Sequence, residues 1–322
     1  MDVTLLGPQR RVAGARSAVA ELVPDGPVAA VNAGWLEREA DTGELDDVLG
    51  GRLVNLELHQ RWQTLREDDP DFDASQLRLS NALTELRTAY RLRLTQALAA
   101  VAAVRRQVRD EGLREAADAD GVEAIRALDA WNLRCGQQIR DAAAEEVQAS
   151  NSDTLARHRE DVARLLGDSA GLVVTGGHVA ILLHLLQLFG IADQLRDSTI
   201  GFPVIAWSAG AMALAERVVL FHDHPPYGAR PAEVYAVGIA AYTGVVPLPH
   251  ARRRLRLDDH DHVGLMARRL APGRGVVMND GARLDLRDGQ SLPDWAPRLS
   301  ETGRVVTGAD AAPASGRASR AW

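Results

Sequence analysis

The chain has 322 residues, of which 46% are hydrophobic and 25% charged, a balance typical of a globular protein with a substantial core. Its net charge of −7 argues against a general affinity for nucleic acids or anionic membranes, and no apolar run is long enough to span a bilayer, so we expect a cytoplasmic protein. All 37 basic residues are arginine, and the absence of lysine excludes enzymes that form Schiff bases, including those that use pyridoxal phosphate.

Short apolar runs between glycines and polar stretches indicate the strands of a mostly parallel sheet with helices on its faces. Three runs lie in the first seventy residues, and the same pattern returns after residue 170. They are VTLLG, PVAAVNAGW and RLVNLEL, followed later by GLVVTGG, PVIAWSAG and GVVMNDG. We therefore expect one α/β domain in two parts, residues 1–70 and 151–308, with a different structure between them.

The intervening residues 71–150 have the pattern of a long helical hairpin. Apolar side chains recur at alternating steps of three and four over residues 79–108, as one stripe of a helix requires. Glycines at 112 and 121 are expected to interrupt the pattern, and a second stripe covers residues 122–139. We expect this apolar surface to form a homodimer. Simple packing on the α/β domain and a lid over an active site are the alternatives.

Ser208 stands where an apolar strand should turn into a helix, in the sequence PVIAWSAGAMALAERV. The pentapeptide AWSAG has the G-x-S-x-G pattern of a nucleophile elbow, with Ala206 in place of the first glycine. Small neighbours suit such a tight turn, and the backbone N–H groups at the helix start can hold an oxyanion. A serine that merely caps a helix is the simpler interpretation. The strand end at Gly176-Gly177 and the segment GVVPLPH, which ends at His250, favour the nucleophile.

The order Ser208, Asp223, His250 is compatible with a serine hydrolase triad. Asp223 closes the apolar run RVVLF, which would hold it on a fixed element. Asp258 and Asp280 are the alternative acids, the second because it follows a late strand. The sequence places candidates for all three roles but leaves the acid open.

Two other groups of residues invite a functional interpretation. Histidines and acids alternate in FHDHPP and DDHDH, but without a third ligand fixed by the pattern we expect solvated loops, a helix cap from Asp258 or Asp259, and no metal site. Arg252 and Arg254 follow the histidine and could bind a substrate carboxylate, with a solvated arginine face as the alternative. The polar tail, residues 309–322, is predicted to be disordered.

The segments VVTGGHVAILLHLL, AWSAGAMALAERVVLFHD and GVVPLPH resemble those of the dipeptidase E and cyanophycinase group of serine peptidases, over roughly residues 165–285. The resemblance implies the class I glutamine amidotransferase-like fold, here with an inserted helical hairpin, and no cofactor. It also implies a role for each site residue: Ser208 as nucleophile, His250 as general base, Asp223 as orienting acid, and the N–H groups of Gly177 and Ala209 as oxyanion hole.

Two positions depart from that family. His178 stands where the family usually has asparagine, so we expect it to affect substrate recognition, and Ala206 replaces the first elbow glycine. Serine at the elbow, where glutamine amidotransferases have cysteine, argues against amidotransferase chemistry. We therefore expect a serine hydrolase that cleaves an amide or peptide bond in a small substrate, acidic substrates included. A non-catalytic binding or scaffold protein that retains the fold is the alternative.

Overall fold

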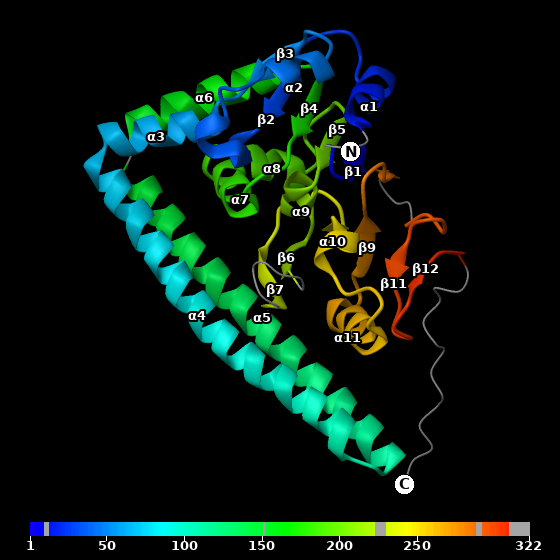
Figure 1. Cartoon of the computed structure of the whole chain (residues 1–322). Coiled ribbons are helices and arrows are strands. Elements are labelled where there is room, and N and C mark those ends of the chain that lie inside the picture. Colours follow the sequence, from blue (N-terminus) through cyan, green and yellow to red (C-terminus); the bar gives the residue numbers. More distant parts are fainter. Residues whose placement is uncertain (10–12, 151, 223–229, 288–291, 309–322) are drawn as a thin grey trace.

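The computed structural model describes residues 1–9, 13–150, 152–222, 230–287 and 292–308 (Figure 1). The strands are β1 (Val3–Leu6), β2 (Val28–Val31), β3 (Leu53–Asn55), β4 (Gly171–Val174), β5 (Val204–Trp207), β6 (Arg217–His222), β7 (Arg230–Val237), β8 (Val245–Pro249), β9 (Arg274–Met278), β10 (Arg283–Leu286), β11 (Arg298–Leu299) and β12 (Val305–Val306). The helices are α1 (Ala15–Leu22), the 3₁₀ helix η1 (Ala33–Arg38), α2 (Gly43–Val48), α3 (Leu58–Asp68), α4 (Pro70–Gln107), α5 (Glu111–Ala149), α6 (Asp153–Gly167), α7 (Val179–Leu188), α8 (Ile191–Arg196), α9 (Ala209–Leu214), α10 (Ala251–Arg254) and α11 (His260–Leu270).

A six-stranded sheet in the order β10-β1-β5-β4-β2-β3 forms the centre of the described structure. β10 is antiparallel to β1, and the other neighbours are parallel. The register pairs Leu6 with Trp207, and Val174 with both Ala206 and Val31, so four parallel strands end at one edge of the sheet. The predicted α/β fold with a mostly parallel sheet is confirmed.

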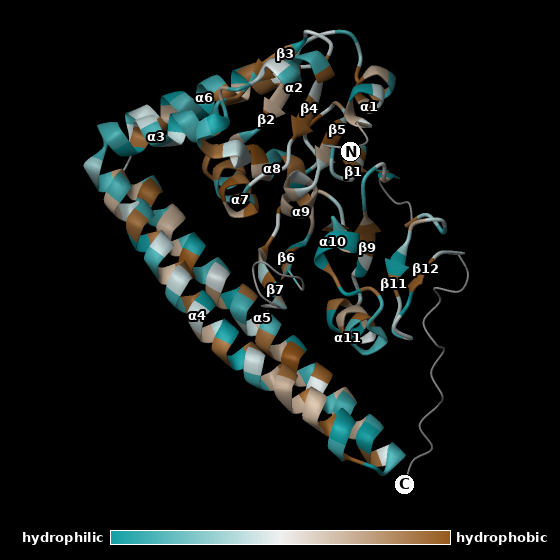
Figure 2. Ribbon diagram, in the orientation of Figure 1, coloured by the Kyte–Doolittle hydropathy of each residue, from teal (hydrophilic) through white to brown (hydrophobic). Residues whose placement is uncertain are grey.

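The strands of this sheet bury both faces because their side chains alternate between two cores. Ile205 and Trp207 of β5 pack with residues of α1 and α2, whereas Val204 and Ala206 join the larger core with α7 and α9. Figure 2 shows the hydrophobic colour concentrated in β4 and α7. Continuous apolar runs in the sequence therefore mark strands that are covered on both sides.

The inserted hairpin consists of α4 and α5, which pack along their length and run down one side of the molecule (Figure 1). The predicted interruptions at glycines 112 and 121 are wrong, because both residues lie inside α5. The chain turns at residues 108–110 instead, where the Asp110 side chain accepts a hydrogen bond from the N–H of Leu113 and caps α5. Gly121 serves close packing, since a Cβ there would lie 2.6 Å from Val101 Cγ2.

A buried ion pair fixes the hairpin to the rest of the protein. Arg269 of α11 donates to both carboxylate oxygens of Asp129 on α5, at 2.6 and 2.7 Å, and both side chains are less than a tenth exposed. Tyr90 of α4 donates to the same carboxylate at 2.6 Å. Burial alone would lower the pKa of Arg269, but its hydrogen bond and charge interaction with Asp129 outweigh this effect and raise it.

The same cluster satisfies the backbone of β7. The Tyr90 hydroxyl accepts from the N–H of Val234, the Asn132 amide donates to the Val234 carbonyl, and Arg269 donates to the carbonyl of Ala232. Side chains thus take the place of a neighbouring strand, because buried backbone groups left without partners are costly.

The domain boundaries themselves stay a prediction. No helix in the described part of the chain is both long and apolar enough to cross a membrane.

Replacing Asp129 with asparagine should lower the free energy of unfolding by about 3–5 kcal/mol, because it leaves the Arg269 charge buried without its partner. Asp141→Asn on the exposed face of α5 is the matched control and should change it by less than about 0.5 kcal/mol. Urea unfolding followed by circular dichroism measures both. Equal effects would show that the ion pair does not hold the hairpin.

Candidate active site

Ser208 lies on a strained turn at the shared edge of the parallel strands. Its backbone has φ 51° and ψ −116°, a conformation that non-glycine residues rarely adopt. It follows β5 directly and precedes α9, and its N–H lies 3.4 Å from the Leu6 carbonyl at the end of β1. This strand, strained turn and helix have the geometry of a nucleophile elbow. Ala206, which replaces the first elbow glycine, fits as a fully buried residue of β5.

The glycine turn after β4 lies against this serine. A Cβ on Gly176 would lie 3.1 Å from Ser208 Cβ and 3.6 Å from its Oγ. Gly177 has φ +120°, and a Cβ there would come within 2.2 Å of the Gly34 carbonyl oxygen of η1. That carbonyl also accepts from the N–H of His178 at 2.8 Å. The two glycines therefore bring the backbone close to the serine, and the turn packs on η1.

Two backbone donors remain available beside Ser208. Among the described residues, the N–H groups of Gly177 and Ala209 donate no hydrogen bond. Gly177 is exposed, and Ala209 is the first residue of α9, where a helix leaves its N–H groups without intrahelical partners. Such a pair of donors can stabilise negative charge that develops on an oxygen.

Close backbone contacts link the end of β1 to the segment that carries His250. Gly7, which follows β1, packs so closely on Asn279 that a Cβ would lie 1.9 Å from the Asn279 carbonyl oxygen. Asn279 follows β9, whose last residue, Met278, accepts from the N–H of His250 at 3.0 Å. His250 has the left-handed backbone conformation, with φ 58°, and is half-buried between β8 and α10.

The structure describes two of the three candidate acids, Asp258 and Asp280. Asp223 follows β6 directly but lies outside the described residues, so its role stays a prediction. Asp258 and Asp280 are both exposed, and Asp280 makes no hydrogen bond with the described residues. Asp259 caps α11 by accepting from the N–H of His262 at 3.0 Å, which confirms the cap expected from this pair of acids.

The residues expected to contact the substrate lie at two places, the start of α7 and α10. His178 caps the start of α7, where its Nδ1 accepts from the N–H of Ile181 at 3.3 Å, and burial lowers the pKa of its ring. Arg252 and Arg254 lie on α10, where Arg252 is exposed and donates its backbone N–H to the Asn279 side chain. Neither Arg252 nor Arg254 lines the cavity at His178 or the smaller pocket beside it.

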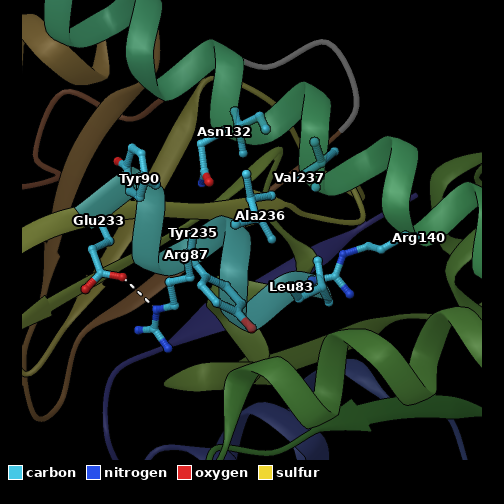
Figure 3. Close-up of a pocket in the computed structure, with 12 residues that line it drawn as sticks. Leu83, Arg87, Tyr90, Asn132, Arg140, Glu233, Tyr235, Ala236 and Val237 are labelled. Atoms are coloured by element: carbon cyan, nitrogen blue, oxygen red, sulfur yellow. Dashed lines mark hydrogen bonds and ion pairs between the residues drawn. The ribbon is translucent and has the colours of Figure 1, made fainter. Parts of the chain in front are cut away.

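A cavity of about 340 Å³ extends from His178 along the helical hairpin. Its walls come from α3, α4, α5, α7 and β7. A smaller pocket borders it at the hairpin (Figure 3), and Arg140 of α5 lines both, which sequence reasoning missed. A signal was present: Leu133, Gly136 and Arg140 follow one another at steps of three and four, so the arginine continues one face of the helix.

Comparison with known proteins identifies the segment that holds these features. The model of Peptidase family S51 matches residues 140–263, which include Gly177, Ser208 and His250. The chain carries a peptidase family S51 domain. The resemblance to the dipeptidase E and cyanophycinase group is thereby confirmed, and membership of this family implies a serine hydrolase.

One solved structure that the chain matches is described as the crystal structure of a peptidase from an acI-B1 Actinobacterium. The two share 14% sequence identity, the match covers 96% of this chain and 94% of the other, and the TM-score is 0.42. None of the curated proteins compared matches the chain.

Gly210→Ala should destabilise this S51 protein by about 1–3 kcal/mol, although alanine is the better helix former. The reason is space: a Cβ on Gly210 would lie 2.4 Å from the Val174 carbonyl oxygen and 2.6 Å from that of Thr175. Gly112→Ala in α5 is the control, because its nearest neighbour is 3.8 Å away, and it should stabilise by about 0.5–1 kcal/mol. Thermal unfolding of the two variants should shift in opposite directions. A stabilised Gly210→Ala protein would contradict the packing of α9 on β4.

Proposed function

We propose that this S51 protein is a serine hydrolase that cleaves an amide or peptide bond in a small substrate. The observation that carries the proposal is the strained backbone of Ser208 beside two available N–H donors, those of Gly177 and Ala209. Strain of this kind is kept where the surrounding structure enforces it, and it is common at catalytic nucleophiles. A serine that only caps a helix would need neither the conformation nor the donors.

In the proposed reaction, Ser208 Oγ attacks the substrate carbonyl while His250 takes the serine proton. The carbonyl oxygen becomes negatively charged and accepts hydrogen bonds from Gly177 and Ala209. His250 then returns the proton to the leaving amine, and an acyl-enzyme remains on Ser208. Water, activated by the same histidine, releases the acid and restores the serine.

Asp223 is proposed to orient His250 and to stabilise its protonated form. Its interval from Ser208 matches the arrangement in dipeptidase E, and the apolar strand β6 ends one residue before it. Asp280 is the alternative acid, because Asn279 before it contacts the backbone that leads to His250.

Ser208→Ala should abolish covalent labelling by a fluorophosphonate probe, because the probe reacts only with an activated serine. Ser198→Ala is the matched control: Ser198 also has a positive φ, 52°, but is exposed at the end of α8, and its loss should leave labelling unchanged. Intact-mass spectrometry counts the adducts. An unlabelled parent protein would favour the non-catalytic binding protein instead.

The rates of the same labelling reaction also identify the acid. Asp223→Asn should slow labelling by about 10⁴-fold if the effect known for serine proteases transfers, because the histidine would lose its tautomer. Asp280→Asn should be much milder. A larger loss in the second variant would move the role to Asp280.

We further propose that the hairpin forms a homodimer through its outer face. Leu92 of α4 is 67% exposed and Leu113 of α5 is 62% exposed, which is unusual for leucines on one hairpin. Sedimentation of the full chain at micromolar concentration should give twice the monomer mass of 34.7 kDa, and Leu92→Glu should shift it to the monomer. A monomeric parent protein contradicts the dimer.

A further inference from the structure

The cavity along the hairpin is lined by apolar side chains and by arginines. Apolar side chains of α4, α7 and β7 form much of its wall, among them Leu79, Leu83, Ile181 and Tyr235. The charged residues that line the cavity are arginines, and no aspartate or glutamate lines it among the described residues. His178, which follows Gly177 of the proposed oxyanion hole in the chain, is one of the residues that line the cavity.

Three arginines line the cavity, and two of them form ion pairs with carboxylates of the protein. Arg66 forms an ion pair with Asp73 at 2.5 Å and stacks over the Trp62 ring. Arg87 forms an ion pair with Glu233 at 2.8 Å, which Figure 3 shows as a dashed line. Both guanidinium groups thus already contact a carboxylate of the protein itself, and Arg87 shares Glu233 with Arg91.

Arg140 differs from both. Among the described residues, no carboxylate lies within 4 Å of its guanidinium nitrogens. Tyr235 of β7 and His184 of α7 line the same cavity. Burial, with a contribution from the Arg140 charge, lowers the pKa of His184 to about 4, so that ring is neutral at pH 7. Its Nε2 lies 2.8 Å from Gln76 Oε1.

Arg140 therefore borders this cavity without a carboxylate in contact from the described part of the chain, and Asp141 and Asp193 line a neighbouring pocket that it also borders. Figure 3 shows the side chain leaving α5 and pointing toward Leu83 of α4. Burial lowers the pKa of Arg140, but an arginine stays protonated across the physiological range. A guanidinium of this kind binds a carboxylate strongly, because the hydrogen bonds are charge-assisted and the surroundings exclude much of the water.

We propose that Arg140 is a specificity-determining residue that binds a carboxylate of the substrate, with the apolar stem of the substrate lying between Leu83 and Ile181. This inference rests on the proposed hydrolase function and adds to it the substrate class: an amide whose apolar portion ends in a free carboxylate. Arg140 then replaces Arg252 and Arg254 as the residue that selects an acidic substrate. The inserted hairpin, which supplies both Arg140 and the opposite wall at Leu83, thereby contributes to substrate choice.

The test compares two ligands that differ only in charge, N-acetyl-leucine and N-acetyl-leucinamide. Calorimetric titration uses the full-length Ser208→Ala protein, which cannot turn either ligand over. The acid should bind at least about tenfold more tightly than the amide, the preference expected of one charge-assisted hydrogen-bonded contact. Arg140→Met should abolish this preference, and Arg140→Lys should retain part of it.

Arg66→Met is the matched control, since it removes an arginine of the same cavity that is already paired with Asp73, and it should keep the preference. Equal binding of acid and amide, no binding of the acid, or a preference that survives Arg140→Met would each overturn the proposal. A preference that Arg66→Met removes as fully as Arg140→Met would overturn it too. Failure of the hydrolase function appears separately, as absence of fluorophosphonate labelling in the parent protein.

Discussion

The buried contact between Arg269 and Asp129 is the interaction on which the arrangement of this molecule depends. It joins α11, which belongs to the α/β part of the chain, to the inserted helix α5, and Tyr90 extends it to α4. Buried charges are tolerated when they are paired and their remaining hydrogen-bonding groups are satisfied. Here the Ala232 carbonyl and the Val234 N–H complete that requirement, so the ion pair also positions β7.

This anchoring has a direct consequence for the cavity. β7 contributes Tyr235 to the wall of the cavity, and Glu233 of the same strand binds Arg87 and Arg91 of α4. Because the hairpin is held by charged and polar contacts along β7 and α11, it forms a fixed wall beside the strand ends. A freely moving lid would have to break these buried contacts, which is unfavourable. The hairpin thus shapes a site whose chemistry resides elsewhere, at the edge of the sheet.

The sequence predicted the features that depend on local pattern. Buried parallel strands have continuous apolar runs, and the turn at Ser208 needs small neighbours, so both were visible in the order of residues. Gly112 and Gly121 misled the prediction because a glycine costs a helix only about 1 kcal/mol, which the packing of Gly121 against Val101 can offset. The strand order, the contact from Gly7 to Asn279 and the exposure of Arg140 to a cavity all depend on tertiary pairing between distant segments. No local signal specifies which face of α5 meets the cavity, so the role of Arg140 required the structure.

The central claim is that Ser208 is a nucleophile whose oxyanion is held by the glycine turn after β4. The most direct test is a crystal structure of the protein after reaction with a fluorophosphonate. We expect a phosphorus atom bonded to Ser208 Oγ, with one phosphonyl oxygen within hydrogen-bond distance of the N–H groups of Gly177 and Ala209. Density for the phosphonyl group on another residue, or an oxygen turned away from both N–H groups, would contradict it.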